Sequence, residues 1–277
     1  MIVVTGAGGA VGGVVAAELA RRGLPFRIVT GHPERVSSLP GEVAVATYDD
    51  ADALARALEP GDRVFMVSMH APYEERLALH RSFVDVAADR RVARVVYLSF
   101  VGAGAGATFR HARSHGATEA MLARAELPFT AVRNGMYLDS IATWVDAEGR
   151  VTGPGGQGRV SFSHRPELGE AIAVLLADPG HDDRSIVTIT TPEAVTLAEL
   201  AALASDVTRD EYRYEPLERE DWIASRRALG RPEWGVEAGI SFYDGVRAGE
   251  ADVVGHDYEA LTGKQPLTIA GAIDLYR

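Results

Sequence analysis

The chain has 277 residues, 47% of them hydrophobic and 24% charged, which is the composition of a folded, enzyme-sized protein. Its formal net charge of −11 argues against binding to nucleic acid, and the lack of cysteine excludes disulfides, cysteine-ligated zinc and thiol catalysis. The apolar runs are shorter than a membrane span and the first predicted strand begins at Ile2, so we expect a cytoplasmic protein with no bound metal and no nucleic-acid or membrane partner.

The first predicted strand, residues 2–5, is apolar and β-branched, and it runs directly into a glycine-rich turn. In the spacing of Gly6, Gly9 and Gly12, the first glycine permits a tight turn, the second lets backbone approach a pyrophosphate, and the third lets a helix pack on the strand. A helix predicted from Val11 to Arg22 would point its N–H groups at the phosphates. The alternative is a glycine turn without a ligand, which the preceding strand and following helix disfavour. We therefore assign a dinucleotide phosphate site to Gly6, Gly8, Gly9, Ala10, Val11 and Gly12.

Further apolar runs alternate with amphipathic stretches along the chain. The predicted strands are 26–30, 43–46, 63–67, 94–98, 130–133 and 185–189. Helical spacing fills most of the gaps, with one apolar stripe made by Ala53, Leu54, Ala57 and Leu58, and another by Leu77, His80, Val84, Ala87 and Ala88. This alternation predicts an α/β fold, a Rossmann-like doubly wound parallel sheet covered by helices.

The regular alternation weakens after Arg133. We predict that residues 1–137 form the dinucleotide-binding core, which a later strand at 185–190 completes, and that residues 138–277 form mainly a smaller substrate-binding region. This second part contains Trp144, Trp222 and Trp234. Its Gly-Pro-Gly-Gly-Gln-Gly segment, residues 153–158, is either a mobile loop over the site or a plain surface turn.

The end of the second strand bears on the choice of cofactor. NAD-specific folds place an acidic residue there to bind the ribose hydroxyls, but residues 30–35 read Thr-Gly-His-Pro-Glu-Arg, with no acid at the strand end. His32 and Arg35 can attract a 2′-phosphate, which favours NADP(H). Glu34 argues against this assignment, and Arg35 has the alternative role of a solvated charge at a helix start.

From residue 1 to about residue 265 the chain resembles the NmrA-like atypical short-chain dehydrogenase/reductases, close to the type-2 NAD(P)H:quinone oxidoreductases. The segments that carry the resemblance are Thr5-Gly6-Ala7 with Gly9 and Gly12, His80-Arg81, Tyr97-Leu98-Ser99, Ala117-Thr118-Glu119, Leu127-Pro128-Phe129-Thr130, Arg133-Asn134-Gly135-Met136-Tyr137, Gly153-Pro154 and Leu261-Thr262-Gly263. The resemblance implies a Rossmann-like sheet, NADP(H) at the carboxyl edge of its strands, and a small C-terminal part enclosing the acceptor. One position departs from the family, because an arginine commonly found after the second strand is Gly31 here.

The superfamily's usual catalytic pair, a tyrosine and a lysine four residues apart on the helix after the fifth strand, is missing. That helix contains His111 and His115, and His115 falls where related reductases carry the lysine. Residues four apart share a helix face, so both imidazoles could lie near the nicotinamide, with His115 as a proton donor or an orienting group. The alternative, packing or exposure to solvent, is the better interpretation for His111.

Polar residues end three other predicted strands. Ser99 occupies the place where the superfamily keeps a hydroxyl that bonds the substrate oxygen, although it could instead cap a turn. After the sixth strand, Asn134 is expected to touch the cofactor, and Tyr137 to replace the missing acid or to act as an aromatic lid. His80 lies in an apolar stripe and should be structural. After the fourth strand, the residues expected to line the nicotinamide ribose are Ser68, Met69 and His70.

Without the tyrosine and lysine, the oxyanion left by hydride transfer must be stabilised in another way. A quinone gives a delocalised anion, and an aromatic ketone beside a phenol can pass a proton internally. We therefore expect an NADPH-dependent reductase of a quinone or an aromatic polyketide ketone, as in antibiotic tailoring, acting on a small aromatic substrate as a monomer or homodimer. The alternative is a non-catalytic NADP(H)-sensing regulator, which the same missing residues allow.

Overall fold

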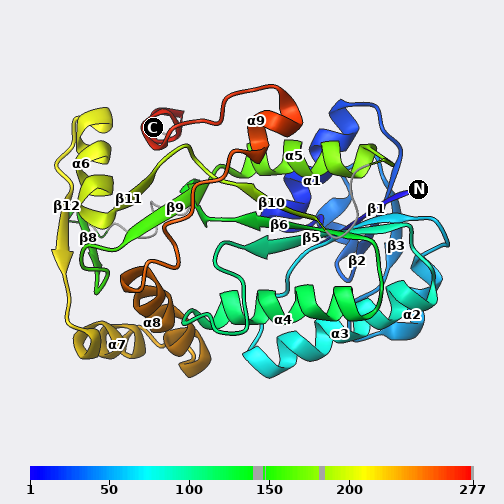
Figure 1. The fold of residues 1–277 in the computed structure, drawn as a ribbon, viewed down its shortest axis with the longest axis horizontal. Coiled ribbons are helices and arrows are strands. Elements are labelled where there is room, and N and C mark those ends of the chain that lie inside the picture. The colour runs from blue at the N-terminus through cyan, green and yellow to red at the C-terminus, as the bar shows by residue number, and fades with distance from the viewer. Residues whose placement is uncertain (140–145, 147, 181–184, 276–277) are drawn as a thin grey trace.

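A seven-stranded parallel sheet forms the centre of the molecule, in the strand order β10-β6-β5-β4-β1-β2-β3 (Figure 1). The computed structural model describes residues 1–139, 146, 148–180 and 185–275. The strands are β1 (Ile2–Thr5), β2 (Phe26–Thr30), β3 (Glu42–Val45), β4 (Arg63–Met66), β5 (Arg94–Phe100), β6 (Phe129–Asn134) and β10 (Ser185–Ile189). This order is that of a doubly wound sheet, so the predicted α/β Rossmann-like fold is confirmed. Its strand order reverses between β1 and β4, where such folds bind their ligands.

Helices cover both faces of the sheet, as the alternating pattern predicts (Figure 1). On one face lie α1 (Ala10–Arg21), α5 (Arg165–Ala177) and α9 (Asp257–Thr262), and on the other α2 (Ala51–Ala57), α3 (Tyr73–Asp89) and α4 (Arg110–Arg124). The predicted stripe on α2 is buried: Leu54 and Leu58 have no exposed surface. Because both faces are covered, every residue of the inner strands β1 and β2 is buried.

The remaining elements gather at the end of the sheet toward which β5 and β6 point (Figure 1). They are β7 (Met136–Tyr137), β8 (Arg150–Gly153), β9 (Arg159–Ser163), β11 (Ala194–Thr196), β12 (Arg213–Pro216), α6 (Leu197–Thr208), α7 (Arg219–Ala228), α8 (Glu233–Arg247) and α10 (Ile269–Leu275). A separate apolar cluster holds them together around Phe162, Trp222 and Tyr243. Both α5 and β10 lie in the second half of the chain, yet they complete the layers of the first.

The glycine-rich segment 153–158 is a tight connection between β8 and β9. The Gly158 N–H donates to the Gly155 carbonyl at 3.1 Å, and a Cβ on Gly153 would meet the Tyr243 ring at 2.5 Å. The segment is therefore packed against α8, which favours the interpretation as a turn. Trp144, expected in the substrate region, lies outside the described residues. Within those residues, no helix is long and apolar enough to cross a membrane.

Candidate active site

The glycine turn after β1 has the shape that a pyrophosphate site needs. Gly6 has a φ of +66°, and the Gly9 N–H donates to its carbonyl at 2.9 Å. A Cβ on Gly12 would lie 2.2 Å from the Gly6 carbonyl oxygen, so no other residue fits there without displacing the turn. Gly9 precedes α1 without a side-chain cap, and no acidic residue lies in the first turn of the helix. The N–H groups of α1, from Ala10 and Val11 onward, are thus available to an anion.

The segment after β2 folds over this turn. A Cβ added to Gly8 would lie 3.1 Å from Arg35 Cβ, so Arg35 stands beside the glycine turn. The side chains of His32 and Arg35 are about 60% exposed, at 62% and 61%. Both approach Glu34, at 3.3 Å and 3.9 Å, so the acid partly offsets their positive charge. A residue larger than glycine at position 31 would press on Thr47, because a Cβ there would lie 2.5 Å from its methyl group.

His80 anchors the loop after β4 by a hydrogen bond. This is the structural role expected for His80. The Met69 N–H donates to His80 Nε2 at 3.0 Å, so the proton of this fully buried imidazole lies on Nδ1, which donates to Thr118 at 2.8 Å. Burial lowers the His80 pKa to about 3, helped by the nearby Arg76 charge. The Ser68 and Met69 backbone is thereby held at the carboxyl edge of the sheet, and His70 beside it is exposed.

A buried arginine joins this loop to α4. Arg76, 4% exposed, donates to Ser68 Oγ, to His111 Nδ1 at 3.1 Å and to His115 Nε2 at 2.8 Å. No carboxylate pairs with it among the described residues. Because a guanidinium can only donate, both imidazoles must accept, and His115 Nδ1 then donates to the Tyr97 hydroxyl at 2.9 Å. The two imidazoles expected near the nicotinamide do share a helix face, and the arginine fixes their tautomers.

These imidazoles are neutral at physiological pH. Burial, reinforced by the Arg76 charge, lowers the His111 pKa to about 4 and holds the His115 pKa well below its usual value of 6.5. A proton on His115 would put two cations 2.8 Å apart in a site that is 7% exposed. This arrangement argues against His115 as a proton donor near neutral pH and favours the alternative, in which His115 orients its neighbours.

Ser99 is the last but one residue of β5. The strand runs two residues further than predicted, to Phe100, and the Ser99 side chain lies toward α4. It is fully buried, and its hydroxyl donates to Glu119 at 2.6 Å, the carboxylate that also pairs with Arg133. The Ser99 hydroxyl is thus already bonded beneath the helix, and its contact with substrate or nicotinamide stays a prediction.

The residues after β6 lie close to the arginine cluster. Asn134, the last residue of β6, is 2% exposed, and its amide donates to the Gly135 carbonyl at 2.6 Å. Its contact with the cofactor stays a prediction. Tyr137 is half-buried under the Arg165 guanidinium, which lies 4.3 Å from the ring centre. Burial raises the Tyr137 pKa, so the phenol is protonated at neutral pH.

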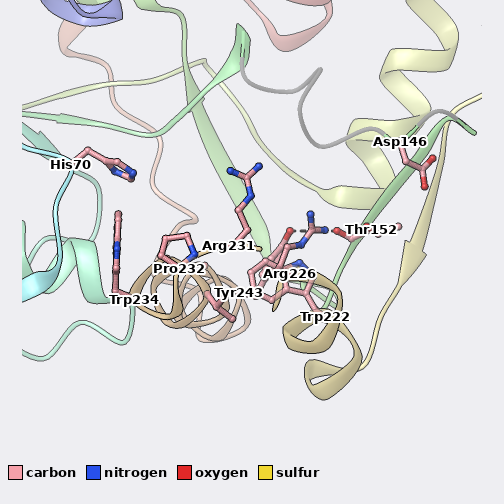
Figure 2. A pocket seen from close by; sticks show the side chains of 12 residues that line it. His70, Asp146, Thr152, Trp222, Arg226, Arg231, Pro232, Trp234 and Tyr243 are labelled. Atoms are coloured by element: carbon pink, nitrogen blue, oxygen red, sulfur yellow. Dashed lines mark hydrogen bonds between the residues drawn. The ribbon is translucent and has the colours of Figure 1, made fainter. Parts of the chain in front are cut away.

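A pocket of about 440 Å³ lies between the loop after β4 and the C-terminal elements (Figure 2). Its aromatic wall consists of Trp222, Trp234 and Tyr243. The exposed His70 contributes the other side, with its ring 5.0 Å from that of Trp234 and 6.4 Å from that of His111. The rings of His70 and His111 thus lie in sequence between this pocket and the Arg76 cluster.

Several residues of this site were not predicted from the sequence. Arg76 has a recognisable signal, because it lies four residues before His80 and seven before Phe83 on one helix face. Nothing in the sequence signals that Arg226 and Arg231 line the aromatic pocket, because only the tertiary fold brings them to the same pocket as His70.

Comparison with known proteins agrees with the fold and the glycine turn. A family model described as NAD(P)H-binding matches residues 6–179. The chain is 31% identical over 274 residues to a (4-alkanoyl-5-oxo-2,5-dihydrofuran-3-yl)methyl phosphate reductase of Streptomyces griseus, covering 95% of this chain and 93% of the relative. It is 27% identical over 241 residues to quinone oxidoreductase 2 of Escherichia coli, covering 84% and 83%.

Among solved structures, the triphenylmethane reductase of Citrobacter sp. complexed with NADP(H) superposes with a TM-score of 0.89 over the full length of both chains. Its sequence is 24% identical, so this likeness supports the fold.

Proposed function

The chain belongs to the NAD(P)H-binding, NmrA-like family of oxidoreductases, and we propose that it is an NADPH-dependent reductase of a quinone or an aromatic ketone. The observation that carries this proposal is the pocket walled by Trp222, Trp234 and Tyr243, which His70 joins to the loop after β4. Aromatic walls bind planar conjugated rings, and this pocket opens beside the edge where the fold holds a nicotinamide.

The relatives support this acceptor class. One is named a quinone oxidoreductase, and another is a reductase of a furanone phosphate from Streptomyces griseus. The second is named for a conjugated but non-aromatic ring, so it supports reduction of a conjugated carbonyl compound. The narrower proposal, an aromatic polyketide ketone reduced in antibiotic tailoring, rests on the resemblance of the sequence to the family.

The glycine turn fits a dinucleotide. Cβ atoms at Gly6 and Gly12 would fill the space beside the turn, and the uncapped N-terminus of α1 offers its N–H groups. We assign the pyrophosphate to this turn and the 2′-phosphate of NADPH to His32 and Arg35, which are exposed beside it. The loop of Ser68, Met69 and His70 is assigned to the nicotinamide side. When bound, the reduced nicotinamide supplies a hydride.

The chain's own residues orient the acceptor and set the local charge. Arg76 holds a positive charge behind Ser68 and His111, which favours negative charge developing on an acceptor oxygen at this edge. His115 positions the Arg76 guanidinium through its ring. Tyr137, protonated and close to this cluster, is our candidate to donate a hydrogen bond to the acceptor.

No described residue of the cluster is an acid with a pKa near neutrality, so the acceptor must tolerate slow protonation. A quinone does so because its anion is delocalised, and an aromatic ketone does so when a neighbouring phenol supplies the proton. Aliphatic ketones lack both features, and we expect them to be poor substrates.

The test is a steady-state assay of NADPH oxidation with naphthoquinones, anthraquinones and hydroxylated tetracyclic ketones, with cyclohexanone as the aliphatic comparison. We expect turnover of at least one aromatic class and little of cyclohexanone. The Trp234→Leu variant should raise KM for the aromatic acceptor with less effect on the KM for NADPH. Micromolar NADPH binding without turnover of any acceptor would favour a cofactor-sensing regulator instead.

A further inference from the structure

The aromatic pocket carries an excess of positive charge, although the chain as a whole has a net charge of −11. Arg226, Arg231 and His70 line it, and Asp146 is the acid among its lining residues. In Figure 2 the Arg231 side chain projects between His70 on one side and Asp146 on the other. The excess of positive charge therefore lies where the proposed hydride acceptor would bind.

The Asp146 carboxylate already has hydrogen-bond partners within its own turn. Its carboxylate accepts from Arg150 Nε at 2.7 Å and from the Glu148 and Arg150 backbone N–H groups at 3.1 Å and 2.9 Å. These hydrogen bonds lower the Asp146 pKa and keep it ionised within its own turn. Asp146 therefore does not neutralise the pocket arginines.

Neighbouring arginines on the same helix show what ordinary pairing looks like. Arg219 bonds Asp244 at 3.1 Å, and Arg227 bonds both carboxylate oxygens of Glu233. Among the described residues, neither Arg226 nor Arg231 has a carboxylate partner. Arg226 is instead held with its guanidinium 5.1 Å from the Trp222 ring centre. The two arginines that face the pocket are thus the ones left without an anion.

Two buried donors in the same wall also lack acceptors. The Nε of Arg226 and the indole Nε1 of Trp222 are both buried, and neither has a hydrogen-bond partner. Each unsatisfied buried donor costs about 1–3 kcal/mol, so this wall of the pocket is short of hydrogen-bond acceptors. An aromatic wall with surplus donors and cations fits a ring that bears an anionic substituent.

We propose that this pocket selects acceptors carrying an anionic substituent on the aromatic ring, a carboxylate, sulfonate or phosphate monoester, which Arg231 and Arg226 bind. This inference rests on the proposed reductase function for the identity of the ring, and it adds the charge of the substrate. Arg231 is exposed and approaches the substituent from the open side, whereas Arg226 is held on Trp222. A guanidinium binds each of these oxyanions through paired N–H groups.

A binding experiment tests the site without relying on turnover. Calorimetric titration of the full-length protein with 2-naphthoate, naphthalene-2-sulfonate, 2-naphthyl phosphate and neutral 2-naphthamide compares anions with a neutral ring of similar shape. We expect the best anion to bind ~10-fold more tightly than the amide, with an affinity that falls as salt rises. The ranking among the three anions distinguishes the substituents. Equal affinity for all four probes would overturn the proposal.

Substitutions identify the residues. Arg231→Gln should weaken anion binding ~3-fold and Arg226→Gln with Arg231→Gln ~10-fold or more, while the amide affinity stays the same. Arg227→Gln is the matched control, because Arg227 lies next to Arg226 on α7, four residues before Arg231, and pairs with Glu233. Arg231 is exposed, so its single variant should fold even if the double variant does not. Anion binding that is unchanged in Arg231→Gln, or lost equally in Arg227→Gln, would contradict the assignment.

A kinetic comparison separates this proposal from the proposed function. We would measure kcat/KM for 1,4-naphthoquinone-2-sulfonate and 2-methyl-1,4-naphthoquinone in the wild type and in Arg231→Gln, so that the intrinsic reactivity of each quinone cancels. The ratio should fall ~3-fold in the variant. If neither quinone is reduced but anion binding still depends on Arg231, the reductase function fails and the anion site stands. If both are reduced with the same ratio in both proteins, the anion site fails and the reductase function stands.

Discussion

The buried imidazoles around Arg76 should make the stability of this protein fall steeply below pH 6.5. Folding lowers the pKa of His80 from 6.5 to about 3 and that of His111 from 6.5 to about 4, with burial as the main cause and Arg76 second. In the unfolded chain these groups take up protons near pH 6.5, but in the folded protein they remain neutral. The unfolded state therefore binds more protons below pH 6.5, and stability rises with pH through this window.

The size of the effect follows from the shift. At pH 5, the unfolded form of each imidazole gains roughly 2 kcal/mol from protonation relative to neutral pH, while the folded form gains almost nothing. His80 and His111 together should thus cost about 4 kcal/mol of unfolding free energy between pH 7.5 and pH 5. His115, whose pKa is also lowered, adds to this. Such a loss is a large part of the stability of an ordinary domain.

The assay is urea unfolding followed by tryptophan fluorescence at pH 7.5, 6 and 5, for the wild type and for His111→Gln. Glutamine keeps an acceptor for Arg76 but does not titrate, so the variant should lose about 2 kcal/mol of the pH dependence. The exposed His256→Gln gives the matched control for the substitution. A His111→Gln protein with the full pH dependence of the wild type would refute the reasoning, because His111 would then accept its proton in the folded state.

Three further predictions concern the cluster and the cofactor site. Arg76→Gln removes a buried cation and should raise the pKa of both His111 and His115, as measured by NMR titration of their ring protons; unchanged values would mean that burial alone sets them. Gly12→Ala places a Cβ 2.2 Å from the Gly6 carbonyl and should abolish NADPH binding in calorimetry, whereas Gly106→Ala, with open space around its Cβ, should bind normally. Arg35→Gln should raise the Kd for NADPH ~10-fold and leave that for NADH unchanged, and an equal change in both would remove the 2′-phosphate assignment.

The fold could be predicted because its signals are local. Apolar β-branched runs, helical stripes and the spacing of Gly6, Gly9 and Gly12 each report on a few neighbouring residues. The helix predicted from Val11 to Arg22 is observed at Ala10–Arg21. The strand end near Ser99 was less exact: β5 was predicted to end at residue 98 and is observed to end at Phe100, with the Ser99 hydroxyl bonded to Glu119 of α4. Whether Ser99 contacts substrate or nicotinamide stays a prediction.

The candidate site was harder to predict because it is made by contacts distant in sequence. Arg76 and His115 are 39 residues apart, and they meet because α3 packs against α4. The sequence alone suggested His115 as a proton donor or an orienting group, whereas the arginine that makes both imidazoles acceptors lies on another helix. The pocket is lined by both His70 and Arg231, which is more than 150 residues later in the chain, and no sequence pattern predicts that two such distant residues share a pocket.

The proposed reduction of aromatic acceptors by NADPH takes place in the pocket walled by Trp222, Trp234 and Tyr243. A stopped-flow single turnover tests it, in which protein loaded with NADPH is mixed with increasing 1,4-naphthoquinone and the loss of reduced-nicotinamide absorbance is followed. We predict a rate that saturates with the quinone, and a half-saturating concentration several-fold higher in Trp234→Leu. Bound NADPH that persists at every quinone concentration, or a rate that Trp234→Leu leaves unchanged, would contradict the account.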